Sequence, residues 1–82
     1  SNTYMKKDAV KRILENTQKL VAEWEIMEMY VTSCAEKQTD KKNKASLELQ
    51  ANDLKAKIKT QKEFLVGFTA FYMAGNFDDT TL

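Results

Sequence analysis

The sequence predicts an all-α protein, a single domain over residues 1–82 in which two long helices fold back on each other as an antiparallel hairpin. The chain has 82 residues, no proline and only two glycines, so little in it would break a helix. Apolar residues recur at heptad spacing in two long stretches. A short polar segment separates these stretches, as is usual between antiparallel neighbours in helical bundles.

The first helix is predicted over about residues 4–38. Its apolar residues form two tracks with a spacing of seven, offset from each other by three, as in the core of a packed helix. The tracks are Val10, Thr17, Trp24, Val31 and Ile13, Leu20, Met27, Cys34. Three further residues widen the predicted core face on one side: Leu14, Val21 and Ala35.

A turn is predicted over residues 39–46, where the sequence TDKKNKAS is polar and carries residues that favour turns and caps. Ser46 precedes an apolar residue and is therefore the predicted N-cap of the second helix. Folding the chain about residues 42–43 makes the numbers of facing residues sum to about 85. Leu20 then faces Leu65, and Trp24 lies near Gln61.

The second helix is predicted over about residues 47–74, followed by a short tail over residues 75–82. Gly75 supports a stop there, because glycine readily adopts the left-handed conformation that ends many helices. The core tracks of this helix are Ala51, Ile58, Leu65, Tyr72 and Leu47, Leu54, Gln61, Phe68.

Apolar residues also occur away from these core faces. One hairpin cannot cover them, and such a surplus of apolar surface favours an interface. We expect this interface to consist of Ala22, Ile26, Met29, Val66, Gly67, Ala70, Met73 and Ala74. Because a domain this small is marginal alone, a homodimer forming a four-helix bundle with coiled-coil packing is the favoured arrangement. A different protein partner is the other possibility.

Most catalytic and metal chemistry is excluded by composition. The chain has no histidine and one cysteine, Cys34, so catalytic triads, common zinc sites and an intramolecular disulfide are absent. No glycine-rich phosphate loop is present. We therefore expect no catalytic, metal or cofactor-binding residues, no cofactor and no enzymatic activity.

Lysines are the one charged feature that suggests a ligand. Residues 37–62 hold eight lysines and three acidic residues, whereas the rest of the chain carries a net charge of −4. This cluster could contact phosphates, although no arginine or aromatic residue accompanies it and solvation alone can explain it. The candidate contacts are Lys41, Lys42, Lys44, Lys55, Lys59 and Lys62.

The leading function is therefore a small interaction protein, an adaptor, regulator or inhibitor acting through an apolar helical surface. The alternative is a nucleic-acid-binding accessory protein, and the third is a structural subunit of a larger assembly. The lone cysteine is typical of a reducing compartment, which predicts a cytoplasmic location. The longest apolar-rich run has about 12 residues, against roughly 18 for a spanning helix, so no membrane association is expected.

Overall fold

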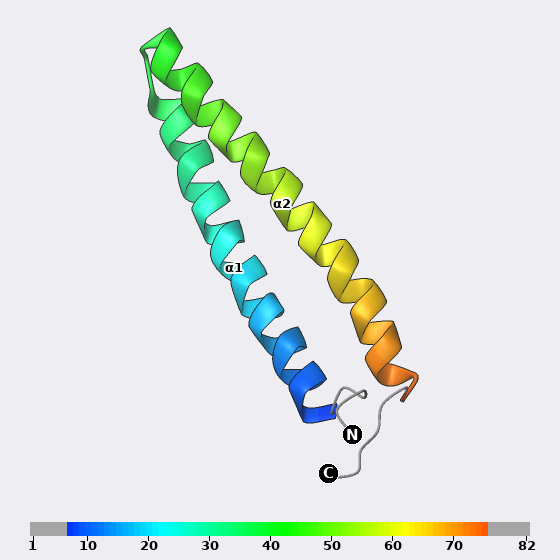
Figure 1. Cartoon of the computed structure of the whole chain (residues 1–82). Helices are drawn as coiled ribbons and strands as arrows, with labels where there is room; N and C mark the ends of the chain where they lie inside the picture. Colours follow the sequence, from blue (N-terminus) through cyan, green and yellow to red (C-terminus); the bar gives the residue numbers. More distant parts are fainter. Residues whose placement is uncertain (1–6, 76–82) are drawn as a thin grey trace.

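The protein is a hairpin of two long α-helices, α1 (Lys7–Lys37) and α2 (Lys41–Met73), which pack antiparallel along their length (Figure 1). The structure, a computed structural model, describes residues 7–75. These residues contain no strand. The molecule is a rod with extents of 59 × 18 × 16 Å. The predicted all-α hairpin is thus confirmed, while residues 4–6 of the predicted first helix and residues 76–82 of the predicted tail lie outside the described range.

The turn is much shorter than predicted, because helix α2 begins at Lys41 and not near residue 47. Asp40 is the N-cap: its Oδ2 atom accepts a hydrogen bond from the backbone N–H of Asn43 at 2.9 Å. Gln38 closes the connection from the other side, since its side-chain oxygen accepts from the backbone N–H of Asp40 at 3.2 Å. Ser46 therefore lies inside the helix. Lysine and alanine are good helix formers, so this polar stretch extends α2 once Asp40 caps it.

Helix α2 ends where the sequence predicted. Ala74 is its C-cap, and the backbone N–H of Ala74 donates to the carbonyl of Ala70 at 3.0 Å. Gly75 follows with a φ of +69°, the left-handed conformation that glycine adopts without a steric penalty. The N–H of Gly75 donates to the carbonyl of Tyr72 at 3.1 Å, which satisfies a carbonyl of the last turn.

The predicted core face of α2 is confirmed. Ala51 and Ile58 are buried, and the other residues of the two tracks are half-buried between exposed neighbours. Going along α2, these residues alternate spacings of three and four, so they form one continuous strip against α1. Gln61 is the polar residue of the strip, and it lines a hollow together with Trp24.

The predicted core face of α1 is wrong in one of its two tracks. Leu14, Val21 and Ala35, which were expected only to widen the core, are buried in the seam between the helices. Leu20 and Met27, which were expected at its centre, are 38% and 51% exposed. The second track is therefore offset from Val10 by four residues instead of three. The seam residues of α1 are Val10, Leu14, Thr17, Val21, Trp24, Glu28, Val31 and Ala35.

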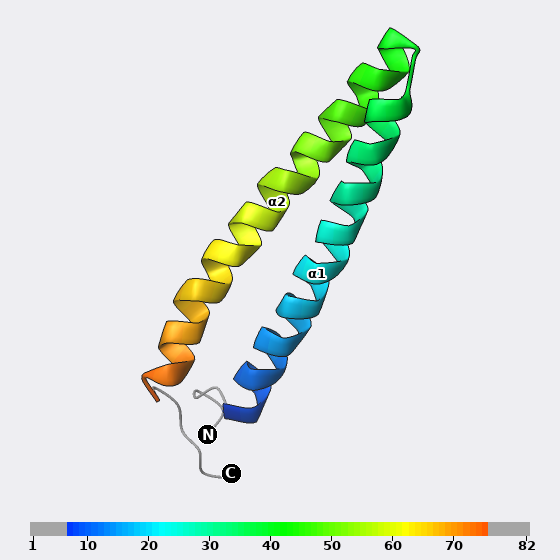
Figure 2. The ribbon, with the colours of Figure 1, turned by 180° about the vertical axis from the view of Figure 1, so that it is seen from behind.

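The two helices lie closest beside the turn and move apart toward the other end of the hairpin, as both views show (Figures 1 and 2). Side-chain size in the seam accounts for this divergence, because the spacing of packed helices depends on the residues at the contact. Two buried alanines, Ala35 and Ala51, line the same small pocket near the turn. Farther away, the seam holds Trp24, Phe68 and Tyr72.

The level at which the two helices pair agrees with the predicted register, but Leu20, which was predicted to face Leu65, stands beside the seam and is exposed. Ion pairs join Glu28 to Lys55 and Glu25 to Lys62, and the residue numbers of these pairs sum to 83 and 87. These values lie on either side of the predicted 85. The ion pairs, and not the length of the loop, mark which residues of the two helices lie at the same level.

The N-cap can be tested by substitution. Asp40→Ala should lower the free energy of unfolding by about 1 kcal/mol, because the first turn of α2 loses its side-chain acceptor. Ser46→Ala is the matched control and should change stability little, since Ser46 lies within the helix. Urea denaturation followed by circular dichroism measures both. A larger loss of stability for Ser46→Ala than for Asp40→Ala would show that α2 begins after Ser46, as the sequence predicted.

The seam can be tested with two leucines in different surroundings. Leu14→Ala should cost about 2–5 kcal/mol, because Leu14 is 8% exposed and its removal leaves a cavity. Leu49→Ala removes the same atoms from a side chain that is 63% exposed and should change stability by about 0.5 kcal/mol or less. Equal losses in urea denaturation would show that Leu14 is not in the core.

Candidate interaction surface

One edge of the seam is lined by ion pairs, and we call Glu25, Glu28, Lys55 and Lys62 the ion-paired edge. Lys62 Nζ lies 2.9 Å from a carboxylate oxygen of Glu25, and both side chains are about half exposed. Lys55 Nζ lies 3.5 Å from Glu28 Oε1, and the Glu28 side chain is only 18% exposed. Charges therefore line this side of the hairpin, where all four residues also border a groove of about 530 Å³.

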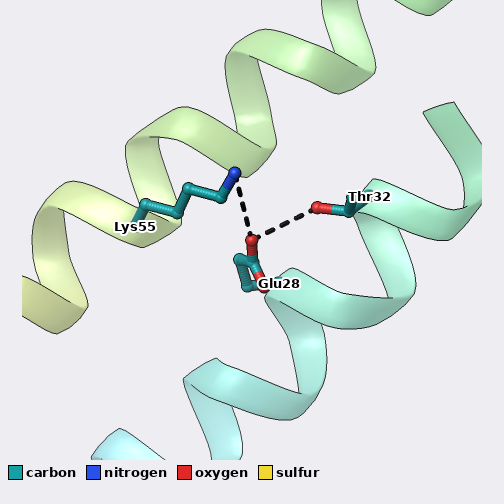
Figure 3. A network of polar contacts seen from close by, with 3 residues as sticks. All are labelled: Glu28, Thr32 and Lys55. Atoms are coloured by element: carbon teal, nitrogen blue, oxygen red, sulfur yellow. Dashed lines mark hydrogen bonds and ion pairs between the residues drawn. The ribbon is translucent and has the colours of Figure 1, made fainter. Parts of the chain in front are cut away.

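Glu28 occupies a seam position of α1 and is held by two neighbours (Figure 3). Its Oε1 atom, besides facing Lys55, accepts a hydrogen bond from the hydroxyl of Thr32 at 3.3 Å. A carboxylate at a half-buried position needs such partners to offset its lost hydration. This arrangement lets a charged residue stand in the otherwise apolar track of α1.

The opposite edge of the seam carries large apolar side chains. They are 36 to 51% exposed, and we call them the apolar flank: Ile13, Leu20, Met27, Phe64 and Phe71. The three residues from α1 recur every seven positions, and so do the two phenylalanines of α2, so each set lies along one line of its helix. The hairpin is thus charged along one edge of its seam and apolar along the other.

Aromatic rings extend from the seam onto this flank. Phe68 is half-buried, and its ring stacks on Phe64 with centroids 5.0 Å apart. It also stacks on Phe71 with centroids 5.9 Å apart. Rings packed in this way lose little further conformational freedom on binding, which favours their use as contacts in an interface.

A hollow of about 360 Å³ also opens beside Trp24. Its other lining residues come from α2: Ala56, Lys57, Thr60 and Gln61. Thr60 and Lys57 precede Phe64 by four and seven residues, which places them on the same side of α2 as the flank phenylalanines. The hollow therefore continues the apolar flank toward the turn.

The residues predicted as an interface lie away from the seam, and we call them the back-face residues. All eight are exposed, with values of 67 to 76% for Ile26, Met29, Val66 and Met73. Gly67 has open space where a side chain would point, so nothing within the chain requires a glycine there. Met29 and Val66 line one groove of about 530 Å³ with Ile58, but the other back-face residues do not line it.

The lysines predicted as phosphate contacts do not form one surface of free charges. Lys55 and Lys62 face carboxylates across the ion-paired edge. Lys59 lines the groove beside Met29. The other three, Lys41, Lys42 and Lys44, lie in the first turn of α2 instead of a loop. Their charges stand at the positive end of the helix dipole, and the acidic residue at this end is the N-cap Asp40.

Sequence reasoning missed the apolar flank because it assigned Ile13, Leu20 and Met27 to the seam. The track that is buried in the structure includes the charged residue Glu28, so a pattern based on apolar residues alone does not identify this track. The signal that could have found it is the apolar spacing of seven from Leu14 to Val21, continued by Ala35 after the charged Glu28.

Other kinds of site find little support among residues 7–75. No group of three side chains suited to metal binding occurs in that range. Neither of the two helices has a stretch long and apolar enough to cross a bilayer. Cys34 is half-buried and forms no disulfide.

Comparison with protein-family models, with curated proteins and with solved structures finds no match to this chain. What the described helices present is exposed apolar side chains, which suggest that some partner covers them.

The ion-paired edge predicts a measurable but small coupling. In a double-mutant cycle with Glu28→Gln and Lys55→Gln, the coupling energy should be below about 1 kcal/mol and should fall in 1 M salt, because Lys55 is 58% exposed. Urea denaturation of the four proteins gives the value. The same cycle on Glu25 and Lys62, both about half exposed, is the control and should give less. A larger coupling in the more exposed pair would contradict the role given to the burial of Glu28.

Proposed function

We propose that this chain is a non-enzymatic interaction protein, an adaptor, regulator or inhibitor that binds other proteins through an apolar helical surface. One observation carries the proposal: in the described part of the chain, eleven large apolar side chains are at least 36% exposed. Exposed apolar side chains in such number support an interaction surface, because apolar surface that a protein leaves open often marks the place where another protein binds. A cytoplasmic, non-membrane setting belongs to the same proposal and fits the lone thiol of Cys34.

Two kinds of partner suit this surface. A second copy is favoured, giving a homodimer and a four-helix bundle, because closed homo-oligomers are common and a lone hairpin is marginal. A different protein can use whatever apolar surface the dimer leaves open. The back-face residues are our candidates for contacts with either kind of partner.

Nucleic-acid binding through the lysines is the second candidate function. It is supported by the net charge of residues 37–62 and by the three lysines that open α2. The carboxylates facing Lys55 and Lys62 weigh against it, because they neutralise the charges that phosphates would need. A structural subunit of a larger assembly is the third, and it would use the same apolar surface.

The proposal predicts that partner binding depends on back-face apolar residues and survives high salt. An immobilised wild-type chain should retain a protein from a cell extract through a 1 M salt wash, since an apolar contact is insensitive to screening. The double variant Ile26→Glu, Val66→Glu should lose that protein while keeping its helical circular dichroism, because both side chains are exposed in the hairpin.

The control variant removes charge instead. Replacing Lys55, Lys59 and Lys62 together by Gln should leave retention of the protein unchanged. Binding of the wild type to duplex DNA or RNA at low salt, lost in the lysine variant, with no protein retained, would replace the proposal with the nucleic-acid alternative.

A further inference from the structure

We infer that two copies of this chain associate through the apolar flank, about a two-fold axis parallel to the helices, so that α1 of each copy packs against α2 of the other. Both turns then lie at the same end of a four-helix bundle. The inference rests on the proposed function and adds to it the surface and the orientation of self-association. It moves the self-contact from the back-face residues to the flank and leaves the back face for a different protein.

The position of the flank on each helix suits a bundle. At 100° per residue, flank residues such as Leu20 and Phe64 lie about 80–90° around their helices from the seam. In a square four-helix bundle each helix has two neighbours in directions about 90° apart. The seam supplies one neighbour, and the flank faces the place of the second. The back-face residue Ile26 points away from both.

The distribution of apolar residues along the flank selects the orientation. Ile13, Leu20, Phe64 and Phe71 all lie in the half of the hairpin away from the turn. With the axis parallel to the helices, every residue keeps its level, and the apolar halves of the two copies cover each other. With the copies reversed end to end, each apolar half would cover the polar half beside the turn.

The charged residues beside the flank favour the same orientation of the two copies. Glu23 lies between Leu20 and Met27 on the flank side of α1, and Lys57 lies one heptad before Phe64 on α2. These residues stand close to the middle of their helices. Reversing the copies would therefore bring Glu23 near Glu23 and Lys57 near Lys57, which is repulsive. In the parallel arrangement, Glu23 of one copy instead lies one to two turns from Lys57 of the other.

The hollow beside Trp24 offers a place for a side chain of the second copy. Because the ion pairs set the register, Met27 lies at the level of α2 residues 56–60. The two-fold axis brings Met27 of the other copy to that same level, against Lys57 and Thr60. Methionine is unbranched and 51% exposed here, so it can fill an irregular gap of this kind.

The long side of the rod that carries the flank is large enough for a standard interface, with its apolar residues mainly in the half away from the turn. One long side of the rod measures 59 by 18 Å, or about 1,000 Å², against the roughly 800 Å² that each partner buries in a standard interface. The radius of gyration is 18.2 Å, against about 12 Å for a compact domain of this length. A second hairpin stacked on the flank would thicken the rod without lengthening it.

The first experiment compares two substitutions on α1 by sedimentation equilibrium. Wild type should have twice the chain mass. Leu20→Glu should lower the mass to that of one chain at concentrations where wild type is dimeric, because it places a charge in the contact. Ile26→Glu is the matched control and should leave the dimer mass unchanged. A reduced mass for Ile26→Glu with an unchanged mass for Leu20→Glu would move the interface to the back face and overturn the inference.

The second experiment needs no variant, because Cys34 is the one thiol of the chain and continues the line of Met27 by one heptad. A spin label on Cys34 should give a distance between the two copies under about 25 Å, since the labels share one level across the bundle. In reversed copies, the two Cys34 residues would lie about 36 Å apart along the axis at 1.5 Å per residue. The longer distance would contradict the orientation even if Leu20→Glu unfolds the chain.

The failure of this inference is distinguishable from failure of the proposed function. A wild-type chain that is monomeric and helical at all concentrations overturns the flank dimer. The proposed function then still stands or falls on whether a different protein is retained through Ile26 and Val66. Conversely, a dimer with the predicted label distance and no retained protein supports the inference and leaves self-association as the chain's one demonstrated interaction.

Discussion

The seam between two helices is narrow, and most features of this molecule follow from that constraint. Contact with a single neighbour covers about two positions in each seven-residue repeat of a helix. In the described helices, six apolar residues are buried, while eleven large apolar side chains are at least partly exposed. A hairpin of this sequence therefore folds with more apolar surface than its single seam covers.

The two edges of the seam differ because different residue types stand beside it. On one edge, the carboxylates of Glu25 and Glu28 meet lysines of α2, and water-exposed charges complete the structure there. On the other edge, Leu20 and Phe64 leave apolar surface in contact with water. The hairpin thus has one edge where ion pairs border a groove and one edge where large apolar side chains are exposed, and the second edge is the one on which we propose that a second copy packs.

The sequence predicted much of the fold, but it placed the α1 seam and the turn incorrectly. The core face of α2 was predictable because every core position except Gln61 carries an apolar or aromatic residue. Helix α1 was not, because Glu28 interrupts the true track and Met27, next to it, completes a plausible false one. The start of α2 depended on one hydrogen bond, from the N–H of Asn43 to Asp40, and both Asp40 and Ser46 were chemically suitable caps. The back-face residues were predicted to lie outside the core, and they are exposed. The flank could not be predicted, because it becomes apparent only when Leu14 and Val21, and not Leu20 and Met27, are known to be buried.

The central claim is that Leu14, Val21 and Ile58 form the core of one hairpin and that the flank is covered by a second copy. Hydroxyl-radical footprinting of side chains, measured residue by residue over a range of protein concentrations, tests it most directly. The account predicts that the three core residues are protected at every concentration. Leu20, Met27 and Phe64 should be modified in dilute protein and become protected as the concentration rises, whereas Ile26 should stay modified throughout. Modification of the core residues in folded protein, or flank residues whose protection does not change with concentration, would contradict it.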